Sequence, residues 1–387
     1  MRFCISTCCV LTALFLVGCM PVKKQNIVVW NRDSKQSIQT FQREVVPPTD
    51  INYSLCELNR GLLFFNNGDF FHSDSRFANG LKVMDRIRED QAKETTAVVW
   101  NETAKVFKGE PYERAMAYFC RGLCHFNTGD YSGALAAFRS SLAADAETRN
   151  KETHLLEDFT ISHFMAALCY SRLGERDNAE AALRMARATR PDNPFLTSAS
   201  LGHNFIAIVG VGSGPYKIGA RKWAVLNTPE TRIALTVDGA AGNAPAEAID
   251  LLVQAKSQTW GQADSARVAR QVGKAVLSGV LSGLTGVNVN IKDYEDLRSW
   301  YGLSLKYYVF TAAVPPGNHT ISLKAYDKKG NELKHYGQIW FDVPVPGPQG
   351  PVLCLRSVAN AQNCYGLRMV QIKPQDAETQ KTDEKGK

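Results

Sequence analysis

Three segments between residues 51 and 195 repeat one pattern of small, glycine and bulky positions. In each segment a small residue precedes a glycine, and a second small residue or an aromatic residue follows that glycine. The repeated positions are Gly61, Gly68 and Phe77; Gly122, Gly129, Ala134 and Phe138; and Ala167, Gly174, Ala179 and Pro191. A small side chain lets two helices pack closely, and a glycine commonly ends a helix. The repetition therefore predicts three helical hairpins in the first half of the chain.

This skeleton resembles the tetratricopeptide repeat (TPR), a helical hairpin of about 34 residues. Pro191 stands where the repeat pattern expects a proline at the end of the third unit. The glycines at 68, 129 and 174 are farther apart than in a regular array, because extra segments separate the units. We therefore expect a compact domain of three hairpins over residues 51–195, rather than a long superhelix with a peptide groove. A generic helical bundle is the alternative.

The start of the chain has the pattern of a bacterial export signal. A short positive start precedes an apolar run at residues 3–17, which is too short to span a bilayer. The run ends in a sequence similar to a lipobox, where a signal peptidase acts beside a lipidated cysteine. The residues of this lipobox are Leu16, Val17, Gly18 and Cys19.

Lipidation of Cys19 predicts a permanent membrane anchor, since each buried methylene of the acyl chains adds about 0.8 kcal/mol. Residues 1–18 would be the signal peptide, and residues 19–50 the lipidated N-terminus and a flexible tether. Met20 follows the cysteine. By resemblance to sorting in Gram-negative bacteria, this residue favours the outer membrane, with the protein facing the periplasm. An uncleaved anchor and an ordinary signal peptide cut elsewhere are the alternatives.

The second half of the chain, residues 196–372, predicts a mixed domain of helix and sheet. Residues 201–211 and 231–237 alternate or carry β-branched side chains, which predicts strands. Residues 246–284 are rich in alanine and predict a mostly helical stretch.

The C-terminal part of this domain predicts β structure. Three alternating runs, at 307–314, 320–326 and 333–343, are separated by strong turn sequences, which favours an antiparallel β-meander. Residues 373–387 contain no apolar cluster and predict a disordered tail. The expected fold class is therefore α+β, with all-α hairpins first and the meander last.

The cysteines beyond the signal segment divide into two groups. Cys354 and Cys364 flank a short polar loop in a compartment that permits disulfides, so they form a possible disulfide. Cys56, Cys120 and Cys169 follow helical apolar patterns, which predicts packing as buried thiols.

The six residues that begin at Cys120 resemble a c-type haem attachment site with one residue too many between its cysteines. Cysteines four residues apart share a helix face, so we expect packing, with no metal and no cofactor.

Charge and hydropathy argue against two broad classes of protein. The chain has 45 basic and 38 acidic residues, for a net charge of +7, but the basic residues are scattered. Scattered charge gives little support to nucleic-acid binding, which uses a basic stripe or arm. Beyond the N-terminus there is no apolar run of about 18 residues, which argues against a polytopic membrane protein.

Four short motifs accompany the lipobox and the TPR-like pattern. They are Gly109-Glu110-Pro111-Tyr112-Glu113, Gly214-Pro215-Tyr216-Lys217, Asp296-Leu297-Arg298-Ser299-Trp300 and Val314-Pro315-Pro316-Gly317. In this order the motifs resemble a family of poorly characterised bacterial TPR-like lipoproteins. Members of that family can be encoded near lipoproteins that activate penicillin-binding proteins. The resemblance spans most of residues 16–343 and brings no established catalytic residues, and Leu303-Ser304 departs from the Leu-Pro pair often found there.

Asp296, Arg298 and Trp300 form the most unusual local cluster in the second half of the chain. Arginine and tryptophan dominate binding hot spots, so the cluster could grip a carboxylate or an aromatic group of a partner. An Asp–Arg pair beside a buried tryptophan is also a common way to fix a domain junction. We favour the junction.

The sequence favours a non-catalytic, lipid-anchored scaffold that binds unidentified envelope proteins through its TPR-like surface. No arrangement of a nucleophile, paired carboxylates or metal ligands can be recognised in the sequence. Neither a small-molecule substrate nor a nucleic acid is expected. A structural subunit of a secretion- or motility-associated envelope assembly is the first alternative, and a protein that binds or processes peptidoglycan is the second.

Overall fold

A computed structural model of the chain describes most of the two predicted domains. It describes residues 46–91, 106–146, 159–194, 196, 201–219, 222–226, 232–241, 246–257, 298–300, 302–333, 338–345, 352–359 and 365–369. The predicted signal peptide, the lipobox with Cys19, most of the tether and the predicted tail lie outside these residues.

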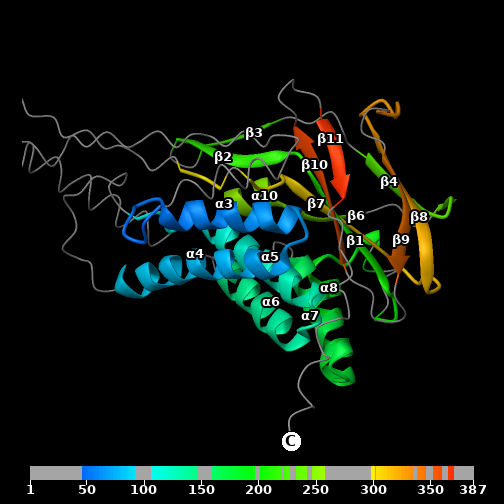
Figure 1. Cartoon of the computed structure of the whole chain (residues 1–387), viewed down its shortest axis with the longest axis horizontal. Coiled ribbons are helices and arrows are strands. Elements are labelled where there is room, and N and C mark those ends of the chain that lie inside the picture. Colours follow the sequence, from blue (N-terminus) through cyan, green and yellow to red (C-terminus); the bar gives the residue numbers. More distant parts are fainter. Residues whose placement is uncertain are drawn as a thin grey trace, which may run out of the picture.

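Six helices of the described residues form three consecutive hairpins (Figure 1). They are α3 (Tyr53–Asn66) with α4 (Phe70–Gln91), α5 (Pro111–Asn127) with α6 (Tyr131–Ala146), and α7 (Thr160–Arg172) with α8 (Arg176–Thr189). Gly68, Gly129 and Gly174 lie in the three connecting turns with φ angles of 74°, 82° and 81°. Glycine adopts this left-handed conformation without strain, so each of the three turns carries the residue that its backbone requires.

Close packing within each hairpin follows the repeated small and bulky positions. A Cβ atom on Gly61 would lie 2.7 Å from the ring of Phe77, and one on Gly122 would lie 2.5 Å from the ring of Phe138. The third hairpin has Ala167 and Leu183 at the equivalent spacing, and both are buried. Compared with the first two hairpins, the third has a larger residue, Ala167, in place of glycine and a smaller one, Leu183, in place of phenylalanine. The two changes offset each other in volume, as close packing requires.

The second half of the described chain forms two larger sheets and a two-stranded ribbon. The strands are β1 (Phe205–Val211), β2 (Ser213–Gly219), β3 (Lys222–Leu226), β4 (Arg232–Val237), β5 (Ala240–Ala241), β6 (Ala246–Asp250), β7 (Lys306–Ala312), β8 (Gly317–Tyr326), β9 (Gln338–Val345), β10 (Val352–Ala359) and β11 (Tyr365–Met369). The five-stranded sheet has the order β11-β10-β1-β7-β6, and the four-stranded sheet has the order β5-β4-β8-β9. Strands β2 and β3 form the ribbon.

The α+β fold class is confirmed, while two details differ from the expectation. Strands β8 and β9 pair in the expected antiparallel manner. Strand β7 instead joins the five-stranded sheet between β1 and β6, so the turn at 313–316 carries the chain from one sheet to the other. Residues 246–250 form strand β6 rather than the start of a helix, and helix α10 (Leu251–Ser257) follows it.

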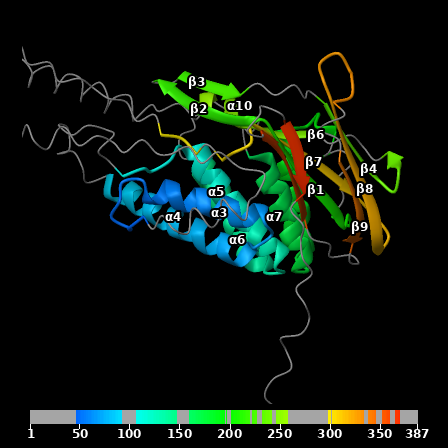
Figure 2. The same cartoon turned by 45° about the horizontal axis from the view of Figure 1, so that its top comes forward.

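The five-stranded sheet lies between the helices and the four-stranded sheet (Figures 1 and 2). Strand β1 is buried along its whole length. Its residues Ile206 and Ile208 belong to the apolar core shared with the helices, whereas Ala207 and Val209 belong to the core shared with the four-stranded sheet. Alternation along a strand places these residues on opposite faces, so β1 is the middle layer of the protein.

None of the helices in the described part of the chain has both the length and the apolar composition that crossing a bilayer requires.

The packing of Gly122 against Phe138 gives a prediction that the third hairpin itself suggests. G122A should lower the free energy of unfolding by up to about 2 kcal/mol, because overpacking costs about 1–3 kcal/mol and alanine regains about 1 kcal/mol of helix propensity. The double variant G122A/F138L copies the Ala167 and Leu183 arrangement and should be more stable than G122A. Urea unfolding of the three proteins measures this. A G122A/F138L variant that is no more stable than G122A would contradict the account.

Candidate functional site at the helix–sheet junction

Three of the short sequence motifs meet where the helices join the sheets. Residues 109–113 begin helix α5, residues 214–217 lie in strand β2, and residues 298–300 precede strand β7. The β2–β3 ribbon lies over the helices near α5 (Figure 2). We use the name junction for the contacts among these three segments.

Glu113 is the central polar residue of the junction. Its side chain is buried, with Oε1 accepting a hydrogen bond from the backbone N–H of Trp300 at 2.5 Å. Its Oε2 accepts a hydrogen bond from the backbone N–H of Glu110 at 2.7 Å. Glu110 and Glu113 form a reciprocal capping box, and Pro111 occupies the first turn of α5. A carboxylate is favoured at this place, because the amino end of a helix carries partial positive charge.

Lys217 connects the ribbon to the same helix start. Its Nζ atom pairs with the buried carboxylate of Glu110, and its backbone N–H donates to Ser299 Oγ at 3.0 Å. The Lys217 side chain is 22% exposed, so most of it is removed from water. A buried carboxylate is tolerated when it is paired in this way, and removing one partner would leave an uncompensated charge.

Two aromatic rings close the side of the junction that faces the ribbon. Tyr112 packs edge-on against Trp223, with ring centroids 5.7 Å apart. Its hydroxyl group donates to the carbonyl oxygen of Pro215 at 3.4 Å. Burial raises the pKa of Tyr112 well above its usual value, and the neighbouring Glu113 carboxylate adds to the effect. The phenol therefore keeps its proton and its role as a donor.

Trp300 connects the junction to the helical core. It is one of the largest fully buried side chains of the described residues, and its ring packs edge-on against Phe77 with centroids 5.9 Å apart. Phe77 is also the ring that fills the space above Gly61. The tryptophan of the third motif thus packs on the aromatic residue of the first hairpin.

Arg298 contacts the residues that directly precede helix α3. It donates to the carbonyl oxygen of Ile51 and to the side-chain oxygen of Asn52, both at 3.0 Å. Its guanidinium group lies 5.6 Å from the centre of the Phe107 ring. Arg298 and Trp300 thus both make their contacts within the chain, while Asp296 lies outside the described residues.

The remaining predicted site residues have different outcomes. Cys120, Cys124 and Cys169 are buried thiols of the helical core, and Cys124 Sγ lies 3.3 Å from Ser73 Oγ. Within the described residues no group of histidine, cysteine and carboxylate side chains could hold a metal ion. Cys364 lies outside the described residues, so its bond to Cys354 stays a prediction.

Sequence reasoning assigned no role to Glu113 and Lys217. The capping pattern of two glutamates three residues apart could have identified Glu113 as a helix-start residue. No local signal identifies Lys217, because its partner Glu110 is more than a hundred residues away in the chain.

Comparisons with known proteins give a limited result. No family model matches this chain, and no curated protein matches it. Among solved structures, it is similar to MamA, with 14% identity over 41% of this chain and 70% of that chain, at a TM-score of 0.28. BtubC from P. vanneervenii matches with 13% identity over 41% of this chain and 54% of that chain, at a TM-score of 0.30. A CopN–Scc3 complex matches with 16% identity over 46% of this chain and 86% of that chain, at a TM-score of 0.20.

The chain's own contacts therefore define the class of protein: an α+β protein in which three TPR-like helical hairpins pack against a β-sheet. The description of the hairpins rests on their turns and on the packing of Gly61 and Gly122, and it does not depend on those structural likenesses.

The burial of Trp300 gives a second prediction. W300A should lower the free energy of unfolding by about 3–5 kcal/mol, because a large buried ring is lost and leaves a cavity beside Phe77. Phe71 is 78% exposed, so F71A is a matched control that should change stability by less than about 0.5 kcal/mol. Chemical denaturation measures both, and equal stabilities for the two variants would count against the junction.

Proposed function

We propose that this protein is a lipid-anchored, non-catalytic adaptor of the bacterial cell envelope that binds another envelope protein through the outer face of its helical hairpins. The observation that carries the proposal is that the hairpins have one covered face and one open face. The anchor and the envelope location rest on the lipobox at residues 16–19.

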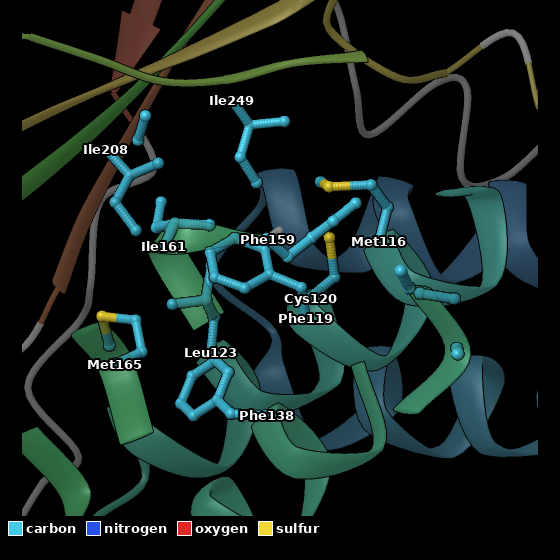
Figure 3. Close-up of a cluster of buried hydrophobic side chains, with 14 of the residues drawn as sticks. Met116, Phe119, Cys120, Leu123, Phe138, Phe159, Ile161, Met165, Ile208 and Ile249 are labelled. Atoms are coloured by element: carbon cyan, nitrogen blue, oxygen red, sulfur yellow. The ribbon is translucent and has the colours of Figure 1, made fainter. Parts of the chain in front are cut away.

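Two inner helices of the array, α5 and α7, are covered by the second half of the chain. Helix α5 contacts β10 and α10, and helix α7 contacts β6. Figure 3 shows Ile208 and Ile249 pointing from their strands toward Met116 and Phe159 on the helical side. Helical repeat proteins commonly bind partners on a concave inner surface. Here that surface is filled, so a partner must use another face.

The outer helices offer such a face. Helix α8 buries a single stripe, formed by Ala179, Leu183, Ala186 and Thr189. Its other side is open to solvent and includes Arg184 and Met185, which is 43% exposed. One buried stripe with exposed polar and apolar residues opposite is the pattern of a surface helix that can still contact a partner.

Three buried carboxylates are poorly placed for acid–base chemistry. Glu57 is held by Arg60, Arg76 and Asn79, while Glu110 and Glu113 serve the junction. A general acid or base needs access to substrate, and these three groups are committed to contacts within the chain.

Site-specific crosslinking in cells tests the binding face. A photo-crosslinking residue at Met185 should capture one envelope protein reproducibly, and the variant R184E should weaken that capture by adding opposite charge to the face. The same crosslinker at Lys324, an exposed position on β8, is the control and should capture little. Equal capture from both positions, or none from Met185, would contradict the proposal.

Substitution of the lipobox cysteine tests the anchor separately. C19A should yield soluble or unprocessed protein, because the thiol that carries the lipid is gone. Cell fractionation and the mass of the mature chain measure the result. Unchanged membrane fractionation with an unchanged mass would remove the anchor from the account while leaving the adaptor face untested by that experiment.

A further inference from the structure

A second cluster of charged groups lies among the first two hairpins, away from the junction. His125 on α5 is placed between two carboxylates from other elements. Its Nε2 atom lies 3.1 Å from Asp74 Oδ1 on α4, and its Nδ1 atom lies 2.9 Å from Asp130 Oδ2 in the turn before α6. Arg121, one turn earlier on α5, completes the cluster, with Nε 2.6 Å from Asp74 Oδ1.

The geometry of this cluster requires a protonated imidazole. An ionised carboxylate only accepts hydrogen bonds, and a neutral histidine has a single N–H to donate. Both ring nitrogens of His125 face carboxylate oxygens, so a neutral ring would place one lone pair against an oxygen at about hydrogen-bond distance. Only the imidazolium form donates to Asp74 and Asp130 at the same time.

Charge counting leads to the same form. With His125 protonated, two positive groups, His125 and Arg121, face two negative groups, Asp74 and Asp130, and the cluster is neutral. The hydrogen bond with Asp74 raises the pKa of His125 above its usual value, against the opposing effect of burial. For Asp74, burial opposes ionisation, but its bonds to His125 and Arg121 outweigh this effect and lower its pKa.

We propose that His125 is a pH-sensitive clamp between the first and second helical hairpins. In its protonated form it bridges Asp74 on α4 and Asp130 at the start of α6. Loss of the proton gives up one of these two bridges. Asp74 still has Arg121, and Asp130 still caps α6 by accepting from the Gly133 N–H at 2.9 Å. The helices therefore stay folded, while the link between the two hairpins becomes weaker.

The direction of the pH dependence follows from the raised pKa. Unfolded histidine titrates near pH 6.5. The clamp contributes its full stability below that pH, and the contribution is lost as the pH rises through the higher pKa of the folded state. We therefore expect tight pairing of α4 and α5 at mildly acidic pH and looser pairing above neutrality.

Hydrogen exchange and melting of the full chain between pH 5.5 and 8.5 test the clamp. After correction for intrinsic exchange rates, the amides of α4 and α5 should lose protection as the pH rises in the parent protein. In H125Q this loss should be absent, and the difference in Tm between the parent and H125Q should shrink as the pH rises. His72 pairs with Asp69 through Nδ1 alone and is more than half exposed, so H72Q is the matched control. It should keep the parental pH dependence at α4 and α5.

A spectroscopic readout keeps the test independent of any variant that fails to fold. The NMR titration of the His125 ring in the parent chain should give a pKa above 6.5, and D130N should lower it. A ring that titrates at or below 6.5, or a difference in Tm that does not change with pH, would overturn the clamp.

Discussion

Strand β1 is buried on both faces, and this constraint organises the protein. A strand of this kind needs an apolar layer above it and another below it. The helical hairpins supply one layer through residues such as Phe159 and Met116, and the four-stranded sheet supplies the other through residues such as Ile321 and Leu323. The two predicted halves of the chain are therefore joined by the apolar core that the helices share with one face of the five-stranded sheet.

The junction determines how these layers meet. The buried carboxylate of Glu113 fixes the backbone at Trp300, and Lys217 fixes the ribbon to the start of the same helix. Each polar contact lies beside an aromatic one, so charge pairing specifies the position and ring packing supplies much of the stability. The inner face of the hairpins is thereby used within the chain, which leaves the outer face for partners.

Local sequence patterns predicted the helical hairpins, whereas contacts between residues far apart in the sequence could not be predicted. The glycines at the turns and the pairing of Gly122 with Phe138 depend on a few neighbouring residues, so one sequence contains enough information to predict them. The assignment of β7 and β8 to different sheets could not be predicted, because an alternating run followed by a Pro-Pro-Gly turn looks the same in a hairpin and in a crossing between sheets. The pairing of Lys217 with Glu110 could not be predicted either, since it depends on how the β2–β3 ribbon packs against the start of helix α5.

The central claim is that the chain's own sheet fills the inner face of the helical hairpins. Cys120 belongs to the same buried apolar core as Ile208 and Ile249 of the sheet, and it is 5% exposed. The most direct test is the rate at which a thiol reagent labels Cys120 in the native full-length protein, followed by mass spectrometry of the labelled peptide. The account predicts labelling only as fast as the whole protein unfolds. Rapid labelling under native conditions would mean that the inner face is open and would contradict the account.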